Sequence, residues 1–326
     1  MSVAPTVLPA LATARAPLPR RRPSPLSDQT FRAASYGAAL LVLVVLAGIL
    51  ASILYGAWPA FREFGPGFVT SAEWNVGMER YGALVAVTGT LYTAALALLI
   101  GVPLSLGIAV YLTQLCPPWA RRPVATTIEL LAAVPSIIYG MWGLFVFAPL
   151  FARFIQVPVS NLVEGLPIVG TLLYARVPSG VGVLTAGIIL GIMIVPFIAS
   201  VTRDVLDQVP TMMRESAYGV GCTTWEVVRH VLIPQAGVSI IGAVMLGLGR
   251  ALGETMAVTF VVGNANRLSA SLFDPGSTIA SRIANEFNEA DGLQLSSLMA
   301  LGCLLFVITF GVLVVARLLV ARVGRR

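Results

Sequence analysis

The sequence of 326 residues contains no lysine, so all 21 of its basic residues are arginines. A P-loop needs a lysine to reach the phosphates of a bound nucleotide. The chain therefore cannot carry a Walker A site, and any ATP chemistry on which it depends belongs to a partner. A genome rich in G and C would favour arginine codons in this way.

Charge, histidine and cysteine are also scarce. Charged residues make up 11% of the chain, against about 25% in soluble domains, and the mean hydropathy is +0.88. His230 is the single histidine, and Cys116, Cys222 and Cys303 form no CxxC or metal-ligand spacing. We therefore expect no metal site. Nucleic-acid binding is excluded as well, because the basic residues are spread over many loops.

Long apolar stretches predict an all-α membrane protein surrounded by lipid. A helix needs about 20 apolar residues to cross a hydrocarbon core about 30 Å thick. Neighbouring helices can satisfy the backbone groups that prolines free inside such stretches, and the recurring glycines permit close helix packing. Six transmembrane helices are expected, at residues 36–57, 82–113, 124–152, 181–202, 235–263 and 295–317.

The N-terminal segment and the arginines predict an orientation. Residues 1–33 are rich in Pro, Ala and Arg, a composition that buries too little apolar area to fold. We expect a disordered cytoplasmic tail there and a transmembrane domain over residues 34–326. The next apolar run is too long for a signal peptide. With the N-terminus inside, fourteen arginines are cytoplasmic, Arg250 lies in a span, and six lie outside, namely Arg62, Arg80, Arg153, Arg176, Arg267 and Arg282. This bias predicts a plasma-membrane protein with both termini in the cytoplasm.

An aromatic segment follows the first expected span. Residues 58–81 contain five Trp and Phe residues, Trp58, Phe61, Phe64, Phe68 and Trp74. Aromatic side chains at a membrane edge commonly form an interfacial belt. Docking of an external partner is the alternative.

A patterned cytoplasmic loop, residues 214–234, lies between the fourth and fifth expected spans. Glu215 is followed by the small residues Ser216 and Ala217, then by Gly221, and an aliphatic-x-aliphatic-Pro sequence ends at Pro234. Small residues allow another protein to approach closely. A glycine can adopt positive φ and end a helix sharply, and a proline suits the first turn of a helix.

This spacing resembles the EAA loop of ABC importer permeases. The resemblance implies that the loop forms a short coupling helix that docks in a groove of a partner ATPase. Serine in place of the commoner alanine at 216 is the one departure from the pattern. An ordinary amphipathic loop is the alternative interpretation.

Further segments narrow the family. The chain after the tail resembles PstC-type phosphate permeases in five segments, Gly89–Leu91, Val134–Gly140, Pro196–Ile198, Gly249–Val258 with Gly263–Asn264, and Ser271–Pro275. The resemblance implies the six-helix, MetI-like fold of type I ABC importers and import of inorganic phosphate. It also implies three kinds of partner: a second, PstA-type permease, two PstB-type ATPases that carry ATP and magnesium, and an external PstS-type phosphate-binding protein. The chain itself would be no enzyme and would bind no cofactor.

Two ionisable residues stand out within the fifth expected span. Arg250 and Glu254 are four residues apart, so a continuous helix would place them on one face. Ionisable residues at membrane depth usually face a bundle interior or a watery path, and a guanidinium binds phosphate oxygens well. We expect both to line the anion path, with a self-paired structural lock as the alternative. Glu129 is expected to snorkel or to pair with an arginine.

Other functions fit less well. A channel would not need a coupling loop, and the spans lack the clustered carboxylates, the Ser/His arrangement or the metal ligands of a membrane enzyme. Within the permease class, two alternatives remain. The chain could be a permease for another oxyanion such as sulfate, or it could be the paired second phosphate permease.

Overall fold

The computed structural model describes residues 25–166 and 169–323, and the chain divides into two units, Met1–Leu50 and Ala51–Arg326. Helix α1 begins at Pro25, so the expected tail is wrong for residues 25–33, while residues 1–24 lie outside the described part. The composition of the first turn explains the early start. Proline is favoured at the beginning of a helix, and Asp28 interacts well with the helix N-terminus.

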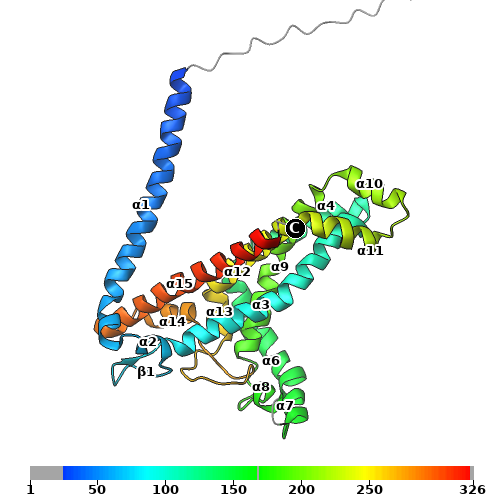
Figure 1. The fold of residues 1–326 in the computed structure, drawn as a ribbon. Helices are drawn as coiled ribbons and strands as arrows, with labels where there is room; N and C mark the ends of the chain where they lie inside the picture. The colour runs from blue at the N-terminus through cyan, green and yellow to red at the C-terminus, as the bar shows by residue number, and fades with distance from the viewer. Residues whose placement is uncertain (1–24, 167–168, 324–326) are drawn as a thin grey trace, which may run out of the picture. The chain divides into compact units, whose positions relative to one another are not determined.

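The described residues are mostly helical, with one two-stranded antiparallel ribbon (Figure 1). The elements in chain order are α1 (Pro25–Phe64), α2 (Gly67–Thr70), β1 (Trp74–Asn75), β2 (Arg80–Tyr81), α3 (Leu84–Val110), η1 (Tyr111–Leu115), α4 (Pro118–Ala132), α5 (Ser136–Trp142), η2 (Gly143–Phe147), α6 (Ala148–Phe151), η3 (Ala152–Gln156), α7 (Val157–Val163), α8 (Val169–Leu173), α9 (Val183–Asp207), α10 (Thr211–Gly219), α11 (Thr224–Val227), η4 (Val228–Leu232), α12 (Ile233–Leu252), α13 (Met256–Val261), α14 (Ile279–Glu286) and α15 (Gly292–Val323), where η marks a π-helical segment.

Six helical segments of the described chain are long and apolar enough to cross a membrane, as the sequence predicts. They are Asp28–Phe64, Leu84–Leu115, Ser136–Val163, Val183–Asp207, Thr224–Leu252 and Gly292–Leu318. The first and sixth contain the whole expected span, and the second and fourth begin two residues after the expected starts, at Leu84 instead of 82 and at Val183 instead of 181. The third and fifth expected spans have the wrong bounds.

The third expected span, 124–152, is broken ahead of Pro135. Helix α4 ends at Ala132 and α5 begins at Ser136, because a proline disfavours helical backbone in the residue before it. The spanning segment therefore begins at Ser136, and α4 is a separate helix. Two ion pairs join α4 to α9, Arg121–Asp207 at 2.6 Å and Glu129–Arg203 at 2.9 Å. The expectation that Glu129 pairs with an arginine is thus confirmed.

The fifth expected span, 235–263, starts earlier and stops earlier than predicted. The helix is continuous from Thr224 to Leu252, and a short non-helical segment, 253–255, separates it from α13. Polar groups compete for backbone partners at this break. The Thr255 hydroxyl donates to the Gly253 carbonyl at 3.4 Å, and the Glu254 carboxylate accepts the Ala257 N–H at 3.4 Å.

Helix α9 is the centre of the bundle in Ala51–Arg326 and packs against α3 and α12. Glycines make the α3–α9 contact close. A Cβ added at Gly187 would lie 2.6 Å from Leu96, and one added at Gly191 would lie 3.3 Å from the Ala97 carbonyl oxygen. Small residues thus bring two membrane helices together, as expected from the sequence.

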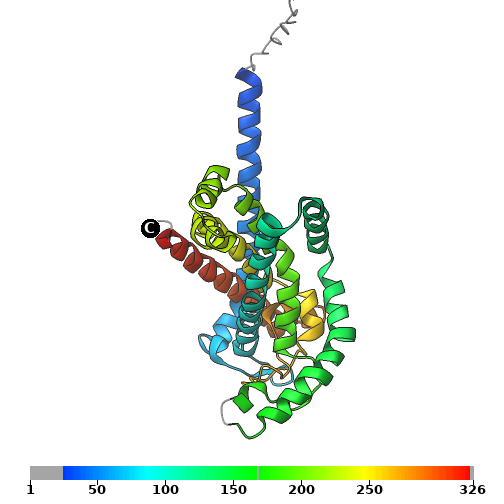
Figure 2. The same ribbon diagram turned by 90° about the vertical axis from the view of Figure 1, so that its right-hand side faces the viewer.

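The two ends of this bundle differ (Figures 1 and 2). We call the end with α4, α10 and α11 the α10 end, and the end with α2, β1, β2 and α14 the α14 end. At the α14 end, Phe68 and Trp74 are buried in a cluster with Tyr81. The belt and docking interpretations are therefore wrong for Phe68 and Trp74, whereas Trp58 is 63% exposed.

Arg282, which was expected in an outer loop, lies on α14 and is buried. Its guanidinium carbon lies 4.8 Å from the centre of the Trp74 ring, and Nη1 lies 3.2 Å from a Glu286 carboxylate oxygen. The other Glu286 oxygen accepts the Trp74 indole N–H at 2.9 Å. Burial lowers the pKa of Arg282, and the charge of Glu286 opposes that change.

Candidate functional site

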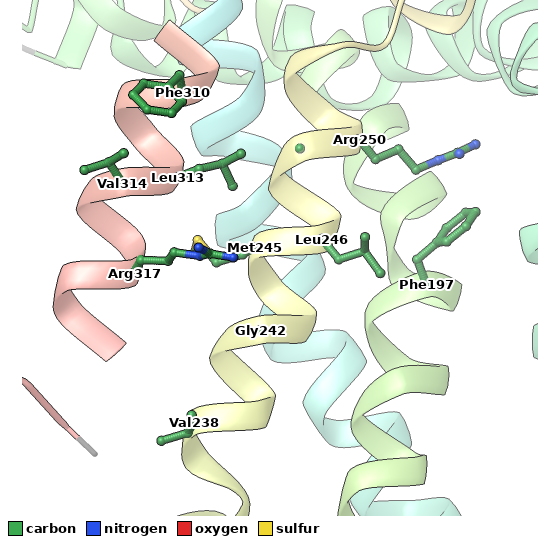
Figure 3. A pocket seen from close by; sticks show the side chains of 11 residues that line it. Phe197, Val238, Gly242, Met245, Leu246, Arg250, Phe310, Leu313, Val314 and Arg317 are labelled. Carbon is green, nitrogen blue, oxygen red and sulfur yellow. The ribbon is translucent and has the colours of Figure 1, made fainter. Parts of the chain in front are cut away.

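Arg250 occupies the last turn of α12, where a cation interacts favourably with the helix C-terminus. Its guanidinium carbon lies 4.2 Å from the centre of the Phe197 ring of α9 (Figure 3). Such a contact contributes about 0.5–2 kcal/mol, more when it is desolvated. Nε of Arg250 is buried and has no hydrogen-bond partner among the described residues. The side chain is therefore held by a ring and retains an unused donor.

Arg250 and Glu254 do not form the expected pair. No ion pair joins them in the described structure, because α12 ends at Leu252 and the i,i+4 geometry of a continuous helix is lost. The Glu254 carboxylate instead faces the N-terminus of α13 through the Ala257 N–H, where negative charge is stabilised. The interpretation of the two residues as one self-paired lock is therefore wrong.

A groove of about 840 Å³ opens beside Arg250. Its lining comes from α9, α12 and α15, and comprises Phe197, Val238, Gly242, Met245, Leu246, Gly249, Arg250, Phe310, Leu313, Val314 and Arg317 (Figure 3). Arg250 and Arg317 are its two charged residues, and both are cationic. Glu254 does not line this groove. The structure thus places one of the two expected path residues in a cavity and the other at the helix break.

The segment Val134–Gly140 packs against the segment that contains Glu254. A Cβ added at Gly140 would lie 2.9 Å from the Ala257 Cα atom, so α5 and α13 touch through their backbones. The adjacent Tyr139 hydroxyl donates to the Leu131 carbonyl at 3.1 Å. Three of the five segments that resemble PstC-type permeases therefore meet around the end of α12.

The segment Gly89–Leu91 packs at the α14 end against residues that follow the segment Ser271–Pro275, a relation that sequence spacing does not reveal. The Ser277 carbonyl oxygen would lie 2.0 Å from a Cβ at Gly89. The Thr90 hydroxyl accepts the N–H of Ile279 at 3.0 Å. Asp274 is 2% exposed and accepts the Ser269 hydroxyl at 2.7 Å. The sequence motif drew attention to these positions without indicating that they are buried contacts.

The expected coupling segment is largely helical and exposed at the α10 end. Glu215 and Ser216 lie exposed on α10, whereas Ala217 packs partly against a buried cluster. Large apolar side chains nearby are exposed, with Val220 at 82% and Trp225 at 65%. An exposed apolar surface of this kind marks a contact with another protein or with a membrane.

Gly221 lies just after α10 with φ +93°, which confirms the expected positive φ. Open space surrounds the position of its absent Cβ, so backbone conformation alone favours glycine here. The next helix begins at Thr224, after a capping box in which the Thr223 N–H donates to a Glu226 carboxylate oxygen at 2.7 Å.

Pro234 does not begin the spanning helix, contrary to the expectation. It lies in the first turn of α12, which continues directly from α11 and the π-helical segment Val228–Leu232. A proline removes one N–H from a continuing helix. The wider π-helical turn just before it accommodates that missing donor, because its bonds run from i to i+5.

Comparison with known proteins agrees with this architecture. A family model described as "Binding-protein-dependent transport system inner membrane component" matches residues 101–325. The chain is 52% identical to phosphate transport system permease protein PstC of Mesorhizobium japonicum, over 100% of this chain and 99% of that protein. It is 55% identical to PstC of Haemophilus influenzae, over 87% of this chain and 90% of that protein.

Solved structures support the fold. A bacterial ABC transporter that imports the acidic polysaccharide alginate matches with a TM-score of 0.58 and 18% identity, over 91% of this chain and 98% of that one. The inward-facing MetNI methionine ABC transporter matches with a TM-score of 0.52 and 18% identity, over 77% and 99%. The expected MetI-like fold of type I importers is confirmed. The chain belongs to the binding-protein-dependent transport system inner membrane components, and within them to the PstC permeases.

Proposed function

We propose that this chain is the permease subunit of an ATP-driven importer that moves inorganic phosphate into the cytoplasm. The observation that carries the proposal is 52% identity to a PstC protein over the whole chain. The fold and the exposed α10 surface support it. The relatives' names favour phosphate over sulfate, and the PstC role over that of the paired permease.

Arg250 is proposed as the residue that contacts the anion in the membrane. Its contact with Phe197 holds the guanidinium without neutralising it, and its groove contains no acidic residue. A guanidinium offers a planar fork of donors to phosphate oxygens. Apart from Arg317, the rest of the groove is apolar and lowers the local dielectric constant, so the attraction is stronger than in water.

Glu254 is proposed to act on the same path from the helix break. Near neutral pH phosphate keeps at least one proton, whereas sulfate carries none. An ionised Glu254 could accept a hydrogen bond from the protonated anion and would repel sulfate. Its weak contact with Ala257 at 3.4 Å leaves the carboxylate able to change partner.

The segment 214–234 is proposed to couple the bundle to an ATPase. Glu215, Ser216 and the exposed apolar side chains around them would form the docking surface, and Gly221 would set its direction. The full assembly would contain a PstA-type permease, two PstB-type ATPases and an external PstS-type binding protein. Both termini and the α10 end would then face the cytoplasm.

An uptake assay tests the function. The chain is expressed with its partner subunits in a strain that lacks its own phosphate importers, and radiolabelled phosphate uptake is measured with and without this chain. We expect uptake that requires the chain and resists excess sulfate. Equal uptake without the chain, despite normal membrane levels of the partners, would refute the proposal, and strong competition by sulfate would show another oxyanion carrier.

A reporter fusion tests the orientation. A reporter active only outside the cytoplasm is fused after Arg326, and the same reporter is inserted in the outer segment near Gly77 as the matched control. We expect a silent C-terminal fusion and an active Gly77 insertion. The reverse pattern would overturn the proposed topology.

A further inference from the structure

The segment Val134–Gly140 resembles the PstC pattern, yet the proposed function gives none of its residues a role. Tyr139 in this segment carries a hydroxyl at the tip of a ring. The ring packs against the buried cluster of the bundle, which includes Ala251 and Leu252 at the end of α12. The next residue, Gly140, is in backbone contact with α13. The position of the ring is therefore fixed, while its hydroxyl can still rotate.

The Tyr139 hydroxyl lies near the Arg250 guanidinium, whose positive charge acts on it. Figure 3 shows the Arg250 side chain extending toward Phe197 on α9, whereas Arg317 projects from α15 on the other side of α12. Helix α5, which carries Tyr139, also packs against α9. Arg250 Nε is buried and has no partner among the described residues. One cationic donor and one neutral donor thus lie near each other on α12 and α5.

The present partner of the Tyr139 hydroxyl does not depend on it. The hydroxyl donates to the Leu131 carbonyl at 3.1 Å, and the same carbonyl accepts the Val134 N–H at 3.3 Å. A carbonyl oxygen has two lone pairs, so Leu131 keeps a hydrogen bond when the hydroxyl turns away. A bond to an anionic oxygen is about twice as strong as a bond between neutral groups. An anion beside Arg250 would therefore draw the hydroxyl from the carbonyl.

We propose that Tyr139 is a second contact of the transported anion, and that its hydroxyl moves from the Leu131 carbonyl to an anion oxygen when the anion reaches Arg250. This inference rests on the proposed anion path through Arg250. The guanidinium supplies the charge, and the hydroxyl orients the anion without adding a second charge, which keeps binding weak enough for the anion to move on. When the anion leaves, the hydroxyl returns to Leu131, so that no donor stays unpaired in the empty state.

Tyr139→Phe tests the contact, because it removes the hydroxyl and keeps the ring. Phosphate uptake by the assembled transporter at limiting phosphate should fall about tenfold, since the anion loses one charge-assisted hydrogen bond. Sulfate should compete no better than with the unchanged transporter, because Glu254 is intact.

Tyr111→Phe is the matched control. Tyr111 belongs to another spanning segment and is 47% exposed, and within the described residues its hydroxyl makes no hydrogen bond. Its loss should leave uptake within about twofold. Equal uptake by the Tyr139→Phe and Tyr111→Phe transporters would overturn the proposal.

A fluorine label separates a direct contact from a structural role. Fluorotyrosine is placed at position 139 of the assembled, detergent-solubilised transporter, and the fluorine NMR spectrum is recorded as inorganic phosphate is added. We expect the resonance to shift and to saturate with phosphate, and to stay in place with chloride at equal ionic strength. Fluorotyrosine at position 111 should not respond. A resonance at 139 that phosphate leaves unchanged contradicts the proposed contact.

The same label shows whether Tyr139 and Arg250 hold one anion. The phosphate-dependent shift should disappear in the Arg250→Gln transporter, because the anion is no longer held beside the hydroxyl. A full shift in that variant would overturn the shared contact.

The outcomes separate this inference from the proposed function. Phosphate uptake by the transporter with fluorotyrosine at position 139 is measured in parallel. Normal uptake without a phosphate-dependent shift removes Tyr139 from the path and leaves the transport function standing. A saturable shift without any uptake supports the Tyr139 contact and counts against the transport function.

Discussion

Gly89→Ala tests how α3 holds the segment that leads into α14. A Cβ at Gly89 would lie 2.0 Å from the Ser277 carbonyl oxygen, whereas real Cβ atoms do not approach within about 3.0 Å. The two backbones must therefore separate by about 1 Å or more. The neighbouring Thr90 hydroxyl, which accepts the Ile279 N–H at 3.0 Å, would move out of hydrogen-bond range.

The magnitude follows from three contributions. Overpacking a close contact costs about 1–3 kcal/mol. A buried N–H that loses its acceptor, here that of Ile279, costs about 1–3 kcal/mol. Alanine in a helix interior gains roughly 0.5–1 kcal/mol over glycine. We therefore expect Gly89→Ala to lower the free energy of unfolding by about 1–5 kcal/mol.

Gly107→Ala is the matched control, because Gly107 lies on the same helix with no atom within 4 Å of the added Cβ. It should stabilise the protein by about 0.5–1 kcal/mol. The assay heats the detergent-solubilised transporter and follows the intact fraction by size-exclusion chromatography. We expect the Gly89→Ala midpoint to fall by several degrees and phosphate uptake to decline. Equal midpoints for the two variants would show that the α3–Ser277 contact is not rigid.

Three further predictions concern the coupling segment, the anion path and the N-terminal segment. Gly221→Val should weaken co-purification of the ATPase, because a β-branched residue resists positive φ. Gly219→Val should not, because Gly219 also faces open space but does not have a positive φ. Equal effects of the two substitutions would contradict a conformational role for Gly221. Arg250→Gln should abolish most phosphate uptake, and Arg250→Lys should retain only part of it. Arg317→Gln, in the same groove, should reduce uptake less than Arg250→Gln does. Normal uptake by a well-assembled Arg250→Gln transporter would show that Arg250 is not on the anion path. Deleting residues 2–24 should leave uptake within about twofold, or roughly 0.4 kcal/mol, and complete loss with normal insertion would assign the segment a function.

The number and placement of the spanning helices could be predicted from the sequence because lipid imposes a simple condition on composition. About 20 apolar residues in a row satisfy it whatever the tertiary packing. The positive φ of Gly221 was predictable for a similar reason, since it depends on local chain geometry. The central position of α9 was not, because hydropathy does not distinguish a lipid-facing helix from a buried one.

The helix breaks could not be placed by hydropathy either. Gly253, Glu254 and Thr255 lie inside an apolar stretch, and their break depends on competing backbone hydrogen bonds. The alternative interpretation, a self-paired Arg250 and Glu254, is wrong for this reason, since it assumed an unbroken helix.

The break also decides how a movement at the α10 end could reach Arg250. One continuous helix of 29 residues runs from Thr224 to Leu252, about 43 Å at 1.5 Å per residue. The Thr223–Glu226 capping box fixes its first turn to the turn that follows α10, and its last turn carries Arg250. Because the helix is continuous, a displacement imposed at Thr224 would also shift Arg250 near its other end. The non-helical residues 253–255 would then bend, so that α13 would stay against α5. If the helix continued to residue 263, α13 would have to move with α12. The Arg250 guanidinium could then not move independently of α13 and of α5, which packs against it.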